Sequence, residues 1–359
     1  MKFIHCADLH IDSKIEGLPS TKSSNRKEEV LHSFERLCVY AKDNDIKAVI
    51  ISGDMFDGKT PTKRSLDRVI YAISNAKGVD FLYLNGNHDD NAFSFEGVCN
   101  VPKNLKIFNH GFSSFRYDNV VIGAINVSNE FPKNVYDLIT FEKDSFNILA
   151  MHGQVADYKT TQASSLISIP QLKEKYIDYL ALGHYHTFSS GKIDERGIYA
   201  YSGCLDGRGF DELGEKGFVL IDTESKDYYK FVKFSSREYH EFNFDLSFFD
   251  DWFTAREQLL KQVNGSFSSN DILKIILLGE RTTDFYVDLQ ELTDRLNDNF
   301  FFAKVYDKTT LKICEEDYLA DKTVRGEFVR LVWESDLTPE QKKKIITCGL
   351  NAIKGEDIL

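Results

Sequence analysis

The stretch IKAVIISGDMFD, residues 46–57, carries the two features that decide the fold. Residues 46–52 form a continuous apolar run, which is typical of a β-strand buried on both faces. Gly53 then permits a tight turn, and Asp54 follows it. We therefore expect a buried strand that presents a carboxylate at its carboxyl end.

Four other strings repeat this arrangement of an apolar run followed by polar side chains. The runs at residues 2–7, 79–84, 146–151 and 179–182 lead into ADLH, NGNHDD, MHGQ and GHYH. In open α/β sheets, ligands bind at the carboxyl ends of the strands. With Asp54, we expect one site built from eight residues: Asp8, His10, Asp54, Asn87, His88, His152, His184 and His186.

The histidines strengthen this expectation. A lone histidine at the end of a strand is more often a satisfied polar residue than a ligand, but five of the chain's nine histidines belong to these strings. Carboxylate, amide and imidazole donors in this number fit two metal ions, and two-metal sites hydrolyse phosphate esters. We assign no chemistry to the other four histidines, which are His5, His32, His110 and His240.

The order of the elements predicts an α/β fold. Helical periodicity covers residues 25–44, and Pro61 fits the first turn of a second helix whose apolar stripe ends at Ile73. Strands and helices thus alternate early in the chain, which indicates parallel strands with crossover helices. Later strands follow one another with fewer helices, which favours a second, more antiparallel sheet at residues 119–126, 146–151, 179–182, 198–201, 218–221 and 228–234.

Three parts are expected along the chain. Residues 1–238 form the domain with the site, residues 239–316 a small α+β domain, and residues 317–359 a helical tail. The last helix is expected to begin at Thr338, with Pro339 at its first position and Gln341 completing a capping box. Phe300, Phe301 and Phe302 favour a buried strand over a platform for stacking bases.

Composition narrows the class of protein. No run approaches the length of a membrane-spanning helix, and the N-terminus does not read as a signal peptide, so no membrane partner is expected. The six scattered cysteines favour reduced thiols and a cytoplasmic location. The formal net charge of −12 argues against coating nucleic acid through a basic surface. It leaves a nuclease open, since two divalent cations add about +4 where a phosphate must sit.

The strings D-x-H, G-D-x-x-D, G-N-H-D, H-G and G-H-x-H, in this order, resemble those of the calcineurin-like metallophosphoesterases. The resemblance implies a double β-sheet sandwich flanked by helices, with two metal ions bridged by Asp54. One ion would bind Asp8, His10, Asp54 and His186, and the other Asp54, Asn87, His152 and His184. His88 would act on the transition state or leaving oxygen, while Asp57 and Asp89 would support the ligands. Mn²⁺ is the expected metal, with Fe and Zn²⁺ as alternatives.

Within that superfamily, residues 3–12, 176–186 and 201–222 are similar to the SbcD-like DNA repair nucleases, apart from Cys204, where a small polar residue is usual. This resemblance implies DNA as substrate, residues 239–316 as a capping domain, and an SbcC-like coiled-coil ATPase that docks on the C-terminal helices. A homodimer is also compatible with it. Two alternatives stay open: a phosphatase or phosphodiesterase acting on a small nucleotide or phosphoprotein, and a scaffold with an inactive site.

Overall fold

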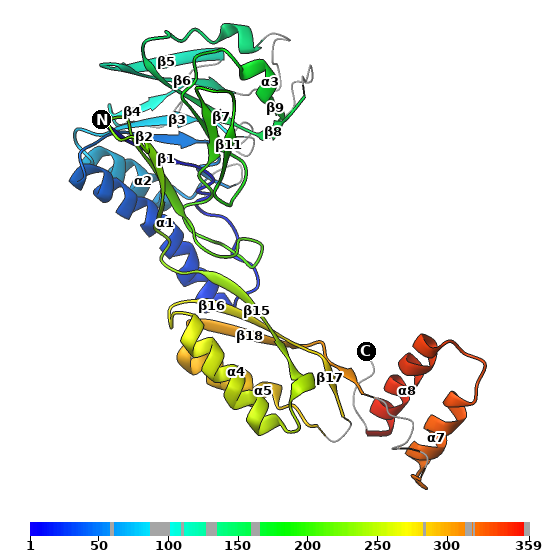
Figure 1. The fold of residues 1–359 in the computed structure, drawn as a ribbon. Coiled ribbons are helices and arrows are strands. Elements are labelled where there is room, and N and C mark those ends of the chain that lie inside the picture. Colours follow the sequence, from blue (N-terminus) through cyan, green and yellow to red (C-terminus); the bar gives the residue numbers. More distant parts are fainter. Residues whose placement is uncertain are drawn as a thin grey trace. The chain divides into compact units, whose positions relative to one another are not determined.

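The computed structural model describes residues 1–57, 61–86, 101–108, 111–126, 135–158, 166–282, 285–312, 318 and 320–354. The chain forms two compact units, Met1–Tyr239 and His240–Leu359 (Figure 1). Each unit has its own buried apolar clusters. Within the described residues, no helix is long and apolar enough to cross a membrane.

The first sheet of the N-terminal unit contains the strand that opens the chain. Its strand order is β14-β13-β1-β2-β3-β4. Neighbours from β1 to β4 run parallel, whereas β13 and β14 pair antiparallel at the other edge. The strands are β1 (Lys2–Cys6), β2 (Ile46–Ser52), β3 (Asp80–Leu84), β4 (Leu105–Ile107), β13 (Gly217–Asp222) and β14 (Tyr229–Lys233).

The second sheet has the order β11-β12-β10-β7-β6-β5. Its four central strands run parallel, so the prediction of a more antiparallel second sheet is wrong. In the described parts of the crossovers between these strands, only short elements occur, such as α3 (Ile169–Leu172), so the sequence shows little helical periodicity between parallel strands. The strands are β5 (Gly111–Tyr117), β6 (Val120–Asn126), β7 (Phe146–His152), β10 (Tyr179–Gly183), β11 (Ser189–Lys192) and β12 (Ile198–Tyr201).

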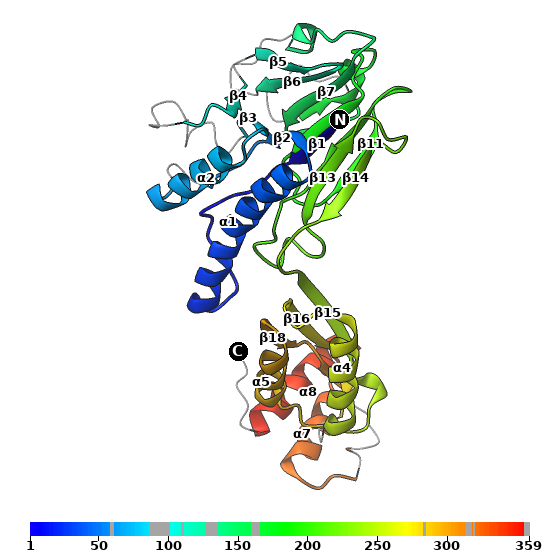
Figure 2. The ribbon, with the colours of Figure 1, turned by 90° about the vertical axis from the view of Figure 1, so that its left-hand side faces the viewer.

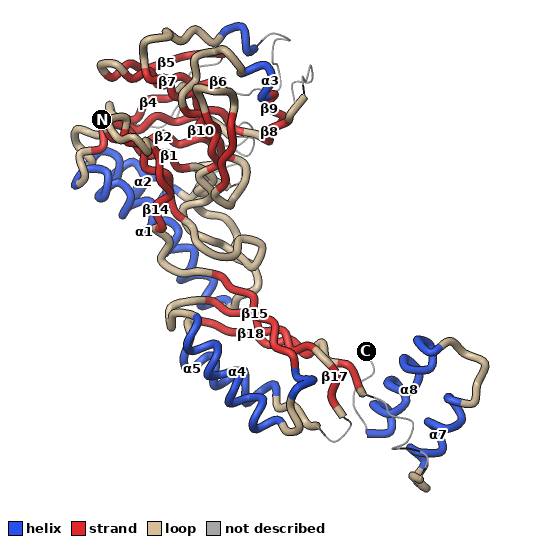
Figure 3. The backbone as a smooth tube through the Cα atoms, viewed as in Figure 1, coloured by secondary structure: helices blue, strands red, loops and turns tan. Residues whose placement is uncertain are grey.

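The two sheets pack face to face around one apolar core. Ile50 and Leu82 from the first sheet are fully buried with Ile148 and Ala181 from the second. Helices α1 (Ser20–Asp43) and α2 (Lys63–Asn75) cover the outer face of the first sheet, as Figures 2 and 3 show. The predicted α/β class and the double-sheet sandwich flanked by helices are therefore confirmed.

Both helices begin elsewhere than the sequence predicts. Helix α1 starts at Ser20, ahead of the predicted residue 25. The prediction missed the first turn because that turn is polar and carries no apolar periodicity. In α2, the Thr62 side chain accepts a hydrogen bond from the Ser65 N–H at 3.2 Å and so caps the helix. Pro61 consequently precedes the helix and does not occupy its first turn.

The C-terminal unit builds a three-stranded sheet from β15 (Tyr239–Asp245), β16 (Ile272–Leu278) and β18 (Phe302–Asp307). Helices α4 (Trp252–Ser266) and α5 (Leu289–Asn299) pack against it through a buried apolar cluster (Figure 1). Phe300 belongs to this cluster, whereas Phe301 and Phe302 are half-buried, and the strand begins only at Phe302. A short parallel pair joins β17 (Glu280–Arg281) to β19 (Thr310–Leu311).

Two C-terminal helices, α7 (Val324–Trp333) and α8 (Pro339–Lys354), enclose a small apolar cluster that includes Val329 and Ile346. The Thr338 backbone N–H donates to the Gln341 side chain at 3.0 Å, and the Gln341 N–H donates to the Thr338 hydroxyl at 3.3 Å. This reciprocal pair confirms the predicted capping box at the start of α8.

His5, to which the sequence assigns no chemistry, is fully buried in β1. Its Nδ1 lies 2.9 Å from the Tyr179 hydroxyl, and the two rings meet edge to face. Burial lowers the pKa of His5 to about 3, although a hydrogen bond with the Leu182 backbone acts in the opposite direction. The folded protein therefore keeps this imidazole neutral at pH values where the unfolded chain protonates it.

We predict that His5 destabilises the fold in acid. As the pH falls below the ordinary histidine pKa of 6.5, His5 binds a proton in the unfolded state but stays neutral in the folded state. At about pH 5 this difference amounts to about 2 kcal/mol. In urea unfolding, the His5→Asn variant, which keeps a polar partner for Tyr179, should lose that much less stability than wild type between neutral pH and pH 5. Equal losses in both proteins would show that folded His5 accepts the proton.

Candidate metal centre

The candidate ligands gather where strands of both sheets end. Asp8 comes two residues after β1, and Asp54 comes two residues after β2. His152 is the last residue of β7, and His184 directly follows β10. The Asp8 N–H donates to the Gly53 carbonyl at 3.1 Å, which ties the two loops of the first sheet together. Stacking the two sheets thus brings four loops to one place.

Five of the predicted ligands form two overlapping groups. Asp8, His10 and His186 offer ligand atoms that all lie within 4.8 Å of one another, and so do Asp8, Asp54 and His152. All are buried except His186, whose side chain is 30% exposed. Asp54 Oδ2 lies 3.3 Å from His152 Nε2 and 3.8 Å from His10 Nε2, so this carboxylate stands between the imidazoles of the two groups.

His184 adjoins both groups without belonging to either. Its backbone N–H lies 3.0 Å from both Asp8 carboxylate oxygens, and its ring lies 5.7 Å from that of His152, centroid to centroid. Asp57 is half-buried, and its backbone N–H donates to the Ile11 carbonyl at 3.2 Å. The three remaining predicted residues lie outside the described residues: Asn87, His88 and Asp89.

The electrostatics of the cluster are those of a cation site. Burial raises the pKa of Asp8 to about 6, with a further contribution from the Asp54 charge. Burial alone would lower the pKa of His152, but the hydrogen bond and charge of Asp54 raise it to about 9. The carboxylates therefore favour positive charge in the site, which a divalent cation could supply. The donor set, with buried carboxylate oxygens and imidazole nitrogens, fits Mn²⁺, Fe or Zn²⁺.

The backbone around these residues is strained. Asp8, His10, Asp54 and His184 all have positive φ angles, of 51°, 42°, 52° and 110°. Such conformations are uncommon for residues other than glycine, and they cluster at functional sites. No signal in the sequence revealed this strain, because each loop contains ordinary loop residues.

Three glycines let the loops approach one another. A Cβ on Gly183 would lie 2.7 Å from His152 Nδ1, and a Cβ on Gly86 would lie 2.6 Å from the Asp54 backbone nitrogen. Gly53 has a φ of +92°, and a Cβ there would collide with the His152 ring. A side chain at any of these positions would therefore displace a candidate ligand.

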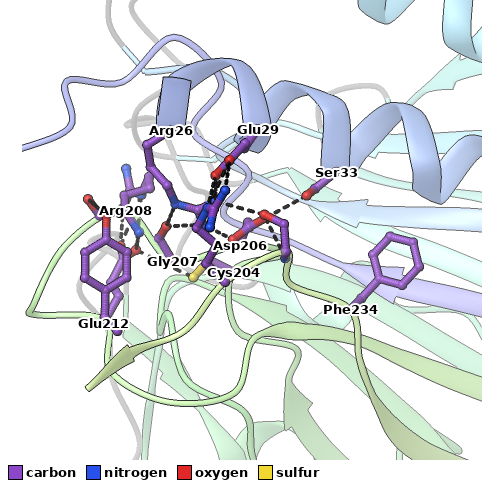
Figure 4. A network of polar contacts seen from close by, with 12 residues as sticks. Arg26, Glu29, Ser33, Cys204, Asp206, Gly207, Arg208, Glu212 and Phe234 are labelled. Atoms are coloured by element: carbon purple, nitrogen blue, oxygen red, sulfur yellow. Dashed lines mark hydrogen bonds and ion pairs between the residues drawn. The ribbon is translucent and has the colours of Figure 1, made fainter. Parts of the chain in front are cut away.

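Two residues beside His186, Arg208 and Glu212, belong to none of the predicted site strings. Glu212 Oε1 accepts a hydrogen bond from His186 Nδ1 at 2.7 Å, and the Arg208 backbone N–H donates to Glu212 Oε2 at 2.7 Å. Burial would raise the pKa of Glu212, but its hydrogen bond with His186 and the charge of Arg208 lower it to about 2. Figure 4 shows Arg208 and Glu212 side by side. Both lie in residues 201–222, the segment that resembles the nuclease branch, which was the only signal for them.

Comparison with known proteins places this geometry in context. The family described as calcineurin-like phosphoesterase matches residues 1–188. The DNA double-strand break repair protein Mre11 of Saccharolobus solfataricus is 24% identical, over 100% of this chain and 97% of that protein. Mre11 of Sulfolobus acidocaldarius is 25% identical over 62% of this chain, which spans 60% of that relative's length. An uncharacterized metallophosphoesterase of Bacillus subtilis, YhaO, is 24% identical over 63% of this chain and 58% of its own length.

Among solved structures, a dimetal phosphatase from Danio rerio is 12% identical, with a TM-score of 0.42, over 61% of this chain and 91% of that one. The family match covers 188 of 359 residues, which is more than half of the chain. The predicted enzyme class, a metal-dependent phosphoester hydrolase, is that of this family. The chain belongs to the calcineurin-like phosphoesterases.

Proposed function

We propose that this protein is a nuclease that hydrolyses phosphodiester bonds of DNA at a two-metal centre and acts in DNA repair. The observation that carries the proposal is the pair of overlapping donor groups, which share Asp8 and have Asp54 between their imidazoles. Similarity to the Mre11 repair proteins, which in one case extends over 100% of this chain, supports DNA as the substrate.

In this proposal one ion takes Asp8, His10, Asp54 and His186, and the other takes Asp54, Asn87, His152 and His184. The position of Asp54 Oδ2, within 3.8 Å of both His10 Nε2 and His152 Nε2, supports its role as the bridging ligand. The His184 N–H fixes the orientation of the Asp8 carboxylate through two contacts of 3.0 Å. Asp57 and Asp89 support the ligands.

The two ions, when bound, supply charge that stabilises the attacking and leaving oxygens of the displacement. We propose Mn²⁺ as the metal, with Fe or Zn²⁺ as alternatives, because Asp, Asn and His ligands together suit a transition metal better than Ca²⁺. His88 stabilises the transition state or protonates the leaving oxygen. The buried walls around Asp8 and Asp54 exclude water from the donors and so strengthen their hold on a cation.

The partner in this proposal is an SbcC-like coiled-coil ATPase, and a homodimer is compatible with it. Helices α7 and α8 leave apolar side chains exposed, among them Leu331 at 61% and Ile345 at 40%, which supports a docking role for them. The proposed location is the cytoplasm. Cys6, Cys38 and Cys204 are buried free thiols, which is what a reducing compartment preserves.

We predict that Asp54→Ala abolishes binding of both metal ions, because the carboxylate contacts the imidazoles of both donor groups. Manganese bound per folded chain, measured by atomic absorption after dialysis against Mn²⁺, should fall from two to none. A variant that keeps one tightly bound ion would contradict the bridging role.

His88→Ala provides the matched comparison. This variant should bind both ions and yet lose hydrolysis, since the proposed role of His88 lies in the transition state and not in the metal shell. Loss of metal together with activity would remove that assignment.

The substrate is tested by incubating the protein with Mn²⁺ and three classes of phosphoester: linear duplex DNA, single-stranded DNA and small phosphoesters. We expect cleavage of DNA, with a further increase when the coiled-coil ATPase is added, because a partner would add positive charge for phosphate contacts to a chain of net charge −12. Rapid turnover of small esters without action on DNA would replace the nuclease with a phosphatase.

A further inference from the structure

The His186 side chain is hydrogen-bonded to a carboxylate that lies outside the proposed ligand set. Glu212 is almost fully buried, with 2% of its side chain exposed, and its Oε1 lies 2.7 Å from His186 Nδ1. Arg208 Nη2 also lies 3.2 Å from Nδ1, but Glu212 Oε1 is the closer partner. A carboxylate can only accept, so Nδ1 carries the hydrogen of the bond to Glu212. The lone pair of the neutral ring is then on Nε2, which is the nitrogen left for a metal ion.

Glu212 is itself held from several directions. Arg208 donates its backbone N–H to Oε2 at 2.7 Å and its side-chain Nε to Oε1 at 3.1 Å. The Cys204 thiol lies 3.7 Å from Oε2. A buried carboxylate with this many donors has one orientation available to it, so it imposes one orientation on His186.

The loop that carries these residues is anchored on helix α1. Arg26, which is fully buried, pairs with the buried Asp206 and donates its Nε to the Gly207 carbonyl at 3.1 Å. The Ser33 hydroxyl, about two turns further along the same face of α1, donates to Asp206 at 2.6 Å. Figure 4 shows this chain of contacts from α1 through the loop to Glu212. The orientation of His186, which follows β10 of the second sheet, thus depends on helix α1, which covers the first sheet.

We propose that Glu212 is a positioning residue that holds His186 with Nε2 directed at the metal, and that Arg208 and the Arg26–Asp206 pair keep Glu212 in place. Carboxylates that accept the outer N–H of a metal-bound histidine fix its ring and raise its basicity, and their loss weakens metal binding about 10- to 100-fold. The inference rests on the proposed metal centre and assigns the Glu212 side chain a role within it.

The test is Mn²⁺ titration by calorimetry of the folded, metal-free full chain. Glu212→Ala should weaken one of the two Mn²⁺ sites about 10- to 100-fold and leave the other unchanged. Glu212→Gln, which keeps the shape and an accepting oxygen, should lose less. Glu215→Ala is the matched control on the same segment, because Glu215 is 60% exposed and lies 3.8 Å from the Lys233 amine. It should bind as wild type does.

A second readout does not depend on affinity. In the Zn²⁺-loaded protein, the His186 Nδ1–H should give a slowly exchanging imidazole proton signal by NMR, which Glu212→Ala removes and Glu215→Ala retains. Wild-type affinity at both sites in a folded Glu212→Ala variant would overturn the inference alone. Failure of the wild-type chain to bind two divalent ions would instead overturn the metal centre from which the inference starts.

Discussion

The burial of two carboxylates, Asp8 and Asp54, at the meeting point of two sheets is the constraint on which the rest of the site depends. Buried charges of the same sign are costly unless opposite charge and hydrogen bonds surround them. Here the His184 N–H contacts Asp8, and the imidazoles of His10 and His152 lie beside Asp54. The pKa values of Asp8 and His152 are raised, to about 6 and about 9, which means that the site favours added positive charge. Two divalent ions would supply that charge.

The packing of the two sheets stabilises the strained backbone of this site. Strained, left-handed residues cost about 1–3 kcal/mol each and persist only where the surrounding structure over-determines them. At Asp8, His10, Asp54 and His184 that structure is a pair of sheets with a fully buried core. Glu212 adds support from outside the strand ends, because it lies on a loop that is fixed on helix α1 and it orients His186. The centre is therefore supported from both sheets and from the helical layer.

The sequence predicted the parts that follow from local chemistry. Apolar runs followed by Asp or His located β1, β2, β7 and β10 and six described candidate ligands, and the capping pair of Thr338 and Gln341 located the start of α8. It failed where long-range pairing decides. The direction of strands in the second sheet depends on crossovers that lack helical periodicity. The left-handed backbone at Asp54 and the contact between Glu212 and His186 arise only when segments distant in the chain meet.

The most direct test of a two-metal centre is the anomalous diffraction of crystals grown with Mn²⁺. Two peaks should lie about 3.5–4 Å apart. Asp54 should contact both, with Asp8, His10 and His186 around one ion and His152 and His184 around the other. A single peak, or two peaks that do not share Asp54, would contradict the proposed centre.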